Sequence, residues 1–201
     1  MGSLAYRPHK SGTLGSVEHQ ANEGRKNSRD LYTATGDERR GMANQPWLNE
    51  IASKVDHAQQ LYHRLIILIG ATGAGSTVAE HRGLKPINVS MQLGEPLLNL
   101  SARRRPLQIG GLLEEIVGEE GEEVVLLDHL EILFEKSLKQ DPLRLLQGIS
   151  RSRTVVAVWS GILEDGSLTY AVPGHPEHRR YPATDLLLVI AEASGDADGQ
   201  A

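Results

Sequence analysis

The chain has 201 residues, of which 26 are acidic and 21 basic, so its formal net charge is −5. This balance argues against a basic protein that wraps nucleic acid, and the lack of cysteine excludes disulfides, thiolate nucleophiles and Cys-based zinc sites. Hydrophobic residues make up 39% of the chain, which argues against complete disorder, but no apolar run is long enough to span a membrane. No apolar signal-peptide core stands near the N-terminus, so we expect a cytoplasmic protein.

The first 41 residues differ in composition from the rest of the chain. They are rich in Gly, Ser, Asn, Arg and Glu, and their few apolar residues follow no sustained period. Such a segment buries too little apolar surface to offset the entropy of ordering it. We therefore predict a disordered extension over residues 1–41, with Met42 as an alternative start, and a disordered tail over residues 193–201. The folded domain is expected over residues 42–192.

Apolar periodicity then predicts helices that alternate with strands. The first helix is expected to begin at Pro46, with Asn44 as its cap and an apolar face that extends to Leu61 and Tyr62. The further helices are expected at 92–100, 106–118 and 142–149, and the strands at 65–69, 86–90, 123–128, 154–160, 168–172 and 185–191. Several of these strands are wholly apolar. The pattern predicts an α/β fold with a mostly parallel sheet covered by helices on both faces.

A glycine-rich segment, Gly70-Ala-Thr-Gly-Ala-Gly-Ser76-Thr77, directly follows the first apolar strand. It fits the phosphate-loop (Walker A) pattern G-x-x-x-x-G-K-[ST], except that Ser76 stands in place of the lysine. In such a loop, glycines let backbone N–H groups surround phosphates, and here Thr77 would bind Mg²⁺ through its hydroxyl. The candidate nucleotide-binding residues are Gly70, Gly73, Gly75, Ser76 and Thr77. A plain glycine turn between a strand and a helix is the alternative.

A second half of such a site is expected at Asp128, which ends the hydrophobic strand Val124-Val-Leu-Leu-Asp128. In phosphate-loop ATPases an acid at this position holds Mg²⁺, although an Asp at the end of a strand is also common without any function. Many such ATPases place a Glu directly after the Asp, but here His129 takes that place. Glu131 is therefore the candidate catalytic base, and a solvated helix residue is an equal alternative.

The chain resembles a known family in several longer segments. They include Val124-Val-Leu-Leu-Asp-His-Leu-Glu-Ile-Leu-Phe134, Ser137-Leu-Lys-Gln-Asp-Pro-Leu-Arg-Leu-Leu-Gln-Gly148 and Pro173-Gly-His-Pro-Glu-His-Arg-Arg-Tyr-Pro182. These segments are similar to BrxF, the small P-loop protein of type 3 BREX (bacteriophage exclusion) systems. The resemblance covers about residues 46–191. It implies a three-layer P-loop NTPase fold, ATP and Mg²⁺ as cofactors, and other subunits of an antiphage complex as partners.

Three departures from the family pattern fall at or near the nucleotide site. Ser76 replaces the lysine, the segment 77–87 is several residues short for the expected helix, and Ser160 stands in place of an asparagine. Because a lysine ammonium neutralises the β and γ oxygens of a nucleotide, its loss lowers the expected rate of hydrolysis by roughly 10²–10³-fold. Arg82 or Lys85 could substitute for it, but their spacing does not recommend either.

Other charged residues have weaker claims to a function. Arg153 or Arg151 could act as an arginine finger or γ-phosphate sensor, in its own chain or toward a neighbouring subunit. Alternatively, they could complement the dipole at the C-terminal end of a helix. The three arginines 103–105 could contact DNA or an acidic partner, but they are more typical of a solvated turn, so direct nucleic-acid contact is not indicated. His175 and His178 are too few for a zinc site, and a packed loop or a partner contact is the better interpretation.

The sequence thus predicts an ATP-binding P-loop subunit of a phage-exclusion complex, with a degenerate Walker A motif and doubtful hydrolysis. The alternative is a non-catalytic interaction module that retains only the fold. A small-molecule kinase is a weaker third interpretation, because no lid segment or substrate-binding acidic cluster follows the loop.

Overall fold

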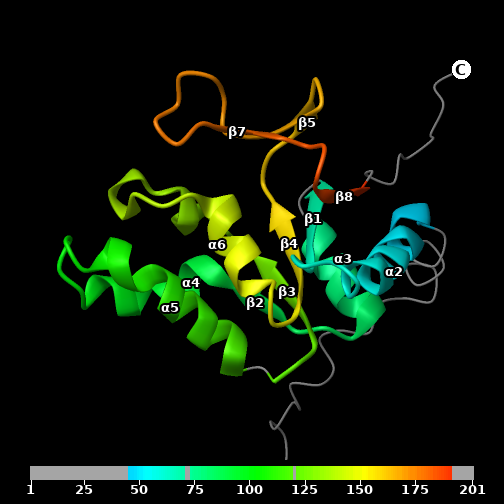
Figure 1. Ribbon diagram of the computed structural model, residues 1–201, viewed down its shortest axis with the longest axis horizontal. Helices are drawn as coiled ribbons and strands as arrows, with labels where there is room; N and C mark the ends of the chain where they lie inside the picture. Colours follow the sequence, from blue (N-terminus) through cyan, green and yellow to red (C-terminus); the bar gives the residue numbers. More distant parts are fainter. Residues whose placement is uncertain (1–44, 71–72, 120, 192–201) are drawn as a thin grey trace, which may run out of the picture. The chain divides into compact units, whose positions relative to one another are not determined.

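Five parallel strands form the centre of the protein, in the order β2-β3-β4-β1-β8. The computed structural model describes residues 45–70, 73–119 and 121–191, so the disorder predicted for residues 1–41 and 193–201 lies outside the described residues. The strands of this sheet are β1 (Leu65–Gly70), β2 (Pro86–Asn88), β3 (Val124–Asp128), β4 (Thr154–Trp159) and β8 (Leu187–Ala191). Since all five run the same way, their carboxyl ends meet at one edge of the sheet (Figure 1).

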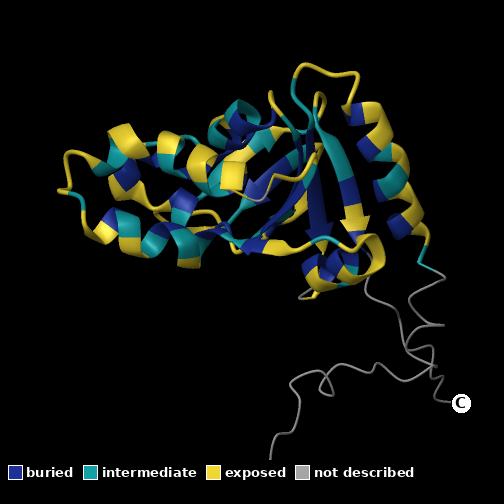
Figure 2. Cartoon of the chain, turned by 90° about the horizontal axis from the view of Figure 1, so that it is seen from below, coloured by how far each residue is buried: buried dark blue, intermediate teal, exposed yellow. Residues whose placement is uncertain are grey.

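Helices cover both faces of this sheet, as its apolar strands require. On one face lie α4 (Val89–Leu98), α5 (Arg105–Glu119) and α6 (Pro142–Ile149), and on the other lie α2 (Pro46–Ala58) and α3 (Ala74–Arg82) (Figure 1). Adjacent β1 residues serve different cores: Ile67 packs with the α4–α6 layer, and Ile66 and Leu68 pack with the α2–α3 layer. Figure 2 shows the buried strands between helices whose outer faces are exposed. The predicted α/β class and the cover on both faces are confirmed.

The ends of several elements differ from the prediction. The expected strand over residues 86–90 ends at Asn88, because the Asn88 side chain accepts a hydrogen bond of 2.9 Å from Met91 N and so begins α4. Helix α2 has Gln45 at its N-cap position, where Asn44 was expected to cap, and it ends at Ala58. Tyr62 lies beyond that end and is 70% exposed, so its predicted place on the apolar face was wrong.

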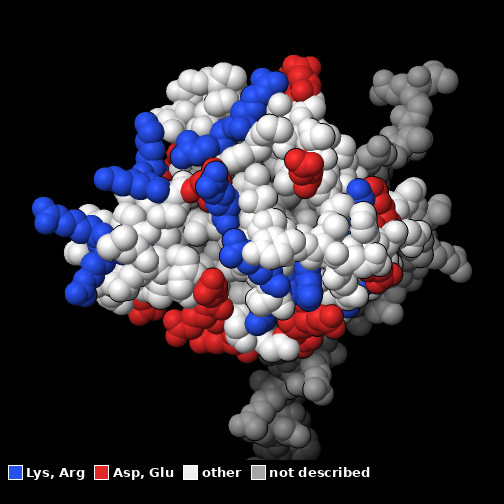
Figure 3. All heavy atoms as spheres, viewed as in Figure 1, with Lys and Arg blue, Asp and Glu red and all other residues white. Residues whose placement is uncertain are grey.

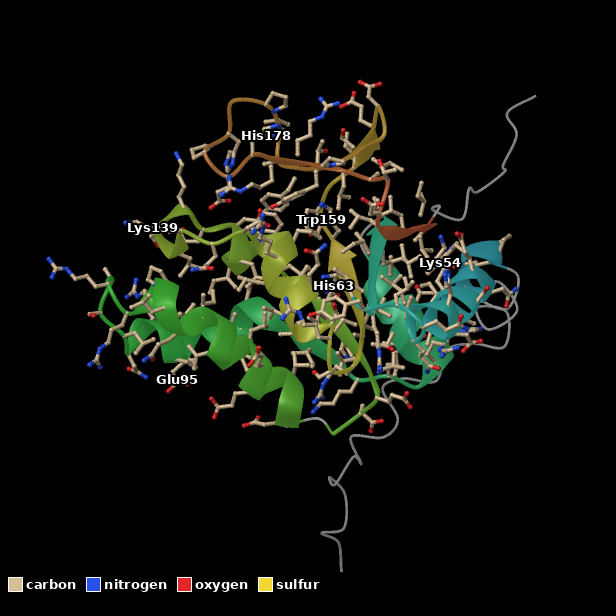
Figure 4. The ribbon with its side chains drawn as sticks, in the orientation of Figure 1. Lys54, His63, Glu95, Lys139, Trp159 and His178 are labelled. Atoms are coloured by element: carbon tan, nitrogen blue, oxygen red, sulfur yellow. The ribbon has the colours of Figure 1, made fainter. Side chains whose placement is uncertain are left out.

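A second, three-stranded antiparallel sheet was not predicted. It consists of β5 (Leu163–Glu164), β6 (Ser167–Tyr170) and β7 (Arg179–Pro182). The expected strand 168–172 is therefore part of this small sheet rather than of the parallel one. Aromatic side chains join the small sheet to the rest of the domain. The indole Nε1 of Trp159, labelled in Figure 4, donates to the carbonyl of Thr169 at 2.7 Å. The rings of Phe134 and Tyr170 stack.

Two short 3₁₀ helices, η1 (Glu131–Phe134) and η2 (Lys136–Leu138), connect β3 to α6. No helix within the described ranges combines the length and the apolar character needed to cross a bilayer.

Candidate functional site

Asp128 and all the predicted residues of the glycine loop except Thr77 line one cavity of about 600 Å³ at the carboxyl edge of the parallel sheet. Asp128 ends β3, which is the second strand from β1 because β4 lies between them. Asp128, which was expected to form the second half of the site, therefore lies at the same edge of the sheet as the described residues of the loop. The cavity is lined by Gly70, Gly73, Gly75, Ser76, Asp128, His129, Glu131, Val158, Trp159 and Ser160.

Glycines shape the turn from β1 into α3 for two different reasons. Gly73 is the N-cap of α3 and has φ +97°, a conformation that residues with a Cβ rarely adopt. Gly70 is fixed by close packing, because a Cβ on it would lie 2.5 Å from the Cβ of Ala191 in β8. The turn brings the first N–H groups of α3 to the cavity, where the helix dipole favours an anion. Residues 71 and 72 of the loop lie outside the described residues.

Thr77 lies in the second half of the first turn of α3. Its N–H and its hydroxyl both donate to the carbonyl of Gly73, at 3.0 and 3.1 Å. The hydroxyl proton is thereby directed toward the helix backbone. Because a hydroxyl oxygen has two lone pairs, the Thr77 oxygen can still accept a bond or bind a cation.

The carboxylate of Asp128 packs directly against the first turn of α3. A Cβ on Gly75 would lie 2.5 Å from Asp128 Oδ2, so only a glycine leaves room for the carboxylate. The other oxygen, Oδ1, accepts a hydrogen bond of 2.8 Å from His129 N. Asp128 is half-buried, and its negative charge lies at the positive end of the α3 dipole. This contact holds the carboxylate at the place where the fold offers N–H groups to an anion.

A strained turn after β3 places Glu131 at the same cavity. His129 has φ +54°, and its carbonyl accepts hydrogen bonds from both the N–H and the hydroxyl of Ser90, at 2.9 and 2.6 Å. Glu131 Oε1 then accepts a bond of 3.0 Å from the hydroxyl of Ser160, which follows β4. The segments that directly follow three neighbouring strands, β2, β3 and β4, thus contribute residues to one polar network.

Ser90 and His129 are the residues of this network that the sequence interpretation did not assign. Ser90 was expected at the end of a strand, and only the capping residue Asn88, two positions earlier, signals that a helix begins there. His129 was noted merely as the residue in place of a glutamate. The sequence does not indicate the positive φ of His129, because this conformation is uncommon for any residue other than glycine, although histidine is among those that adopt it more often.

The cavity is electrostatically negative. Its lining has the carboxylates of Asp128 and Glu131, and no Lys or Arg stands among the described residues that line it. Nearby, burial first, and then the Glu177 and Glu131 carboxylates, raise the pKa of Tyr170. An anionic ligand that enters this space must therefore bring positive charge with it.

Neither of the cations considered as replacements for the missing lysine reaches the loop. Arg82 is the last residue of α3 and lines a different cavity, with Glu122 and Glu123, which precede β3 at the opposite edge of the sheet. Lys85 follows the helix and immediately precedes β2, so it also lies toward the amino ends of the strands. Ser76, which is exposed in the first turn of α3, has no lysine substitute from this segment.

The structure does not bring Arg153 to the site. Arg153 directly precedes β4, so the whole six-residue strand separates it from Ser160, roughly 20 Å at 3.3 Å per residue. Its Nη1 donates to the carbonyl of Val117 in the last turn of α5, at 2.6 Å. A catalytic role of Arg153 within its own chain is incompatible with this position. The contact agrees with the alternative, in which a cation complements the end of a helix.

The two histidines of the segment 173–182 bond within their own loop. His178 Nδ1 lies 3.0 Å from the carbonyl of Ala171, and His175 Nδ1 accepts from Glu177 N at 3.2 Å (His178 is labelled in Figure 4). Within the described ranges, no group of three or more His, Asp or Glu side chains is arranged to hold a metal ion. This loop joins β6 to β7 and packs as a connection of the small sheet.

Comparisons of the chain with protein-family models, with curated proteins and with solved structures found no match. The fold and the site define an α/β protein with a parallel five-stranded sheet, a glycine-rich turn at the carboxyl end of β1 and an aspartate on the next strand but one.

Proposed function

We propose that the chain is an ATP-binding P-loop subunit of a type 3 BREX antiphage defence system. One observation carries the nucleotide-binding part: the Asp128 carboxylate packs on Gly75, in the first turn of the helix that follows a glycine-rich loop. In open α/β sheets, ligands bind outside the carboxyl ends of the strands, which is where this pair lies. The wider sequence resemblance supports the assignment to the defence system.

The residues of the site fit a magnesium-bound nucleotide better than a free one. Asp128 and the Thr77 oxygen would hold Mg²⁺ together with the phosphates, because Mg²⁺ is usually held by one or two protein ligands, substrate phosphates and water. When bound, the ion would neutralise phosphate charge that no lysine neutralises in this chain. The N–H groups from Gly73 onward would bind phosphate oxygens without any side chain. Binding should therefore depend strictly on Mg²⁺, since two carboxylates face the cavity.

Hydrolysis is expected to be very slow. A serine at position 76 brings no charge to the β and γ oxygens, and its short side chain does not span the distance that a lysine covers. Glu131 lines the cavity, and the Ser160 hydroxyl donates to its Oε1 at 3.0 Å. This carboxylate is the candidate base, but a base alone does not stabilise the charge that moves onto the leaving phosphate.

The alternative function, a non-catalytic interaction module, rests on the same negative cavity. The described residues that line the cavity include two carboxylates and no cation. Such a lining is also expected in a protein that keeps the P-loop fold but no longer binds a nucleotide. In that case the segments 137–148 and 173–182, which carry the resemblance, would bind partner subunits. A nucleotide titration separates the two functions.

The experiment is a titration of the full chain with a fluorescent ATP analogue in Mg²⁺, with three variants. Ser76→Lys should tighten binding by about tenfold or more, because it restores a charge-assisted bond to phosphate. Asp128→Asn should weaken binding at least tenfold, whereas the matched control Asp185→Asn, exposed and at the opposite edge of the sheet, should not change it. If Ser76→Lys gives no binding and the unaltered chain gives none, the interaction module is the correct function.

A further inference from the structure

Basic side chains are gathered on one face of the molecule although the domain is acidic overall. Residues 42–201 hold 14 basic and 21 acidic residues. Figure 3 nevertheless shows Lys and Arg over the α4–α5 connection, η2, α6 and β7, whereas Asp and Glu lie mostly along the edge below, toward the C-terminal end of α5, with a few near β5 and β8. Seven exposed basic residues lie in these elements or directly after them, and we call them the basic face: Arg103, Arg104, Lys136, Lys139, Arg144, Arg151 and Arg180.

Tertiary contacts bring these separate segments together around α6. Gln140 Nε2 donates to the carbonyl of Pro106 at 2.7 Å, which places the segment with Lys139 beside the start of α5 and its arginines. Tyr181 donates to Asp141 Oδ1 at 3.3 Å, which places β7 at the N-terminal end of α6. Residues more than 70 positions apart in the sequence thus share one surface.

The charges of the basic face are available to a partner. Within the described residues, the one salt bridge joins Lys54 to Glu50 on α2, and none of the seven takes part in any. Arg151 lies over the ring of Tyr62, 5.4 Å from its centroid, an arrangement that orders the guanidinium and leaves its charge in place. Five of the seven are arginines, whose planar fork suits phosphate oxygens better than a lysine does.

We propose that the basic face binds the phosphate backbone of duplex DNA without reading its sequence. The positive charge of this face favours a polyanion as its partner. Because its residues lie outside the described cavities, the face favours a duplex over a single strand. The cavity of the candidate site and two further cavities of about 500 and 400 Å³ are all lined by other residues, so the seven charges lie outside these hollows. Single strands are usually held in grooves lined by aromatic side chains on which bases stack, and none of these three cavities is lined by the basic face. This binding does not depend on the nucleotide site.

The proposal is tested with the full chain and a fluorescein-labelled duplex of about 25 base pairs, by anisotropy at several salt concentrations. The expected dissociation constant at low salt is micromolar, and it should rise steeply between about 50 and 200 mM salt as released counterions predict. Arg144→Glu combined with Arg151→Glu should weaken binding about tenfold and lower the salt slope by roughly two. A second pair, Arg104→Glu with Lys139→Glu, repeats the test at the other end of the face.

The matched control is Lys54→Glu combined with Arg82→Glu, which makes the same charge change on α2 and α3. It should leave the affinity within about twofold, and thermal unfolding should show that all variants are folded. Equal loss in the control and the test pairs would overturn the proposal, because only net charge would then matter. No binding at about 50 mM salt, tighter binding of a single strand of the same length, or salt-sensitive self-association in place of DNA binding would also overturn it.

Discussion

Single residues explain why the glycine loop of this chain differs from a surface turn. The Asp128 carboxylate occupies the space that a Cβ on Gly75 would fill, and Gly73 supplies the positive φ from which α3 begins. Gly75 is thus required because a side chain has no room there, and Gly73 is required because of its positive φ. Their joint effect is to bring a carboxylate and the start of a helix together, and Ser76 then leaves this arrangement without a cation.

A third glycine, Gly161, gives a prediction on stability at the residue scale. A Cβ at this position would fall on the Thr169 carbonyl and lie 2.8 Å from the Trp159 indole nitrogen, where the two form a buried hydrogen bond. Gly161→Ala should therefore lower the free energy of unfolding by more than about 2 kcal/mol, measured by urea unfolding.

The control for this prediction is Gly111→Ala in α5, where a Cβ would meet nothing within 4 Å. Alanine is the better helix former, so this variant should be more stable by about 0.5–1 kcal/mol. A Gly161→Ala protein as stable as the unaltered chain would show that the small sheet shifts freely, and that the aromatic contacts do not fix it.

At the scale of elements, the alternation of β1, β3 and β4 with helices is readable from the sequence, because strands buried on both faces are continuous apolar runs. The ends of elements are less readable. From the sequence, Asn88 could be a strand residue or the N-cap of a helix. Which of the two it becomes depends on whether the apolar face of α4 is buried in the core. The strands β5 and β7 are too short and too polar to show an apolar pattern. They pair with β6 through backbone bonds, and the bond from Trp159 to Thr169 connects this sheet to β4.

Arg153 gives a prediction at this scale, since it connects the end of α5 to the start of β4. Its guanidinium donates to the Val117 carbonyl at 2.6 Å. Arg153→Ala should lower the free energy of unfolding by about 1 kcal/mol, because a helix C-terminal carbonyl loses its charged donor. The same variant should bind Mg²⁺-ATP as tightly as the unaltered chain. A loss of nucleotide binding with unchanged stability would instead indicate a role at a nucleotide site.

At the scale of the whole molecule, the sequence predicts the helix and sheet layers, and it predicts the glycine loop and Asp128 as parts of the candidate site. It does not predict how charged residues are distributed over the surface. The loop and Asp128 were found because each directly follows an apolar strand. Ser90 and the strained His129 were not, since their contact depends on the turn between β3 and η1. The arginines of residues 103–105 indicate only a solvated turn when read alone, and the crossover connections bring them beside α6.

The stability of the whole domain should fall at alkaline pH, and Tyr181 should contribute to this fall. Burial first, and then the Asp141 carboxylate, raise the pKa of Tyr181 above its ordinary value of 10.0. Above that pH the unfolded chain loses the phenol proton while the folded protein retains it, so the free energy of unfolding decreases as pH rises. Below it, both states are protonated and this contribution is fully present.

Tyr181→Phe tests this contribution by urea unfolding at pH 8 and at about pH 10.5. At pH 8 the variant should be less stable by about 0.5–1 kcal/mol, because it lacks the hydrogen bond to Asp141. At the higher pH this difference should shrink, although Tyr170, whose pKa is also raised, still contributes in both proteins. An equal difference at the two pH values would contradict the assignment.

The central claim is that the negative cavity at the carboxyl edge of the sheet binds a nucleotide only together with Mg²⁺. Calorimetric titration of the unaltered chain with ATP tests this claim most directly. In Mg²⁺ we expect one weak site per chain, and in EDTA we expect no heat of binding, because Asp128 and Glu131 then face the phosphates unscreened. Equal binding with and without Mg²⁺ would contradict the account, since it would require a cation from the chain itself that the described lining does not contain.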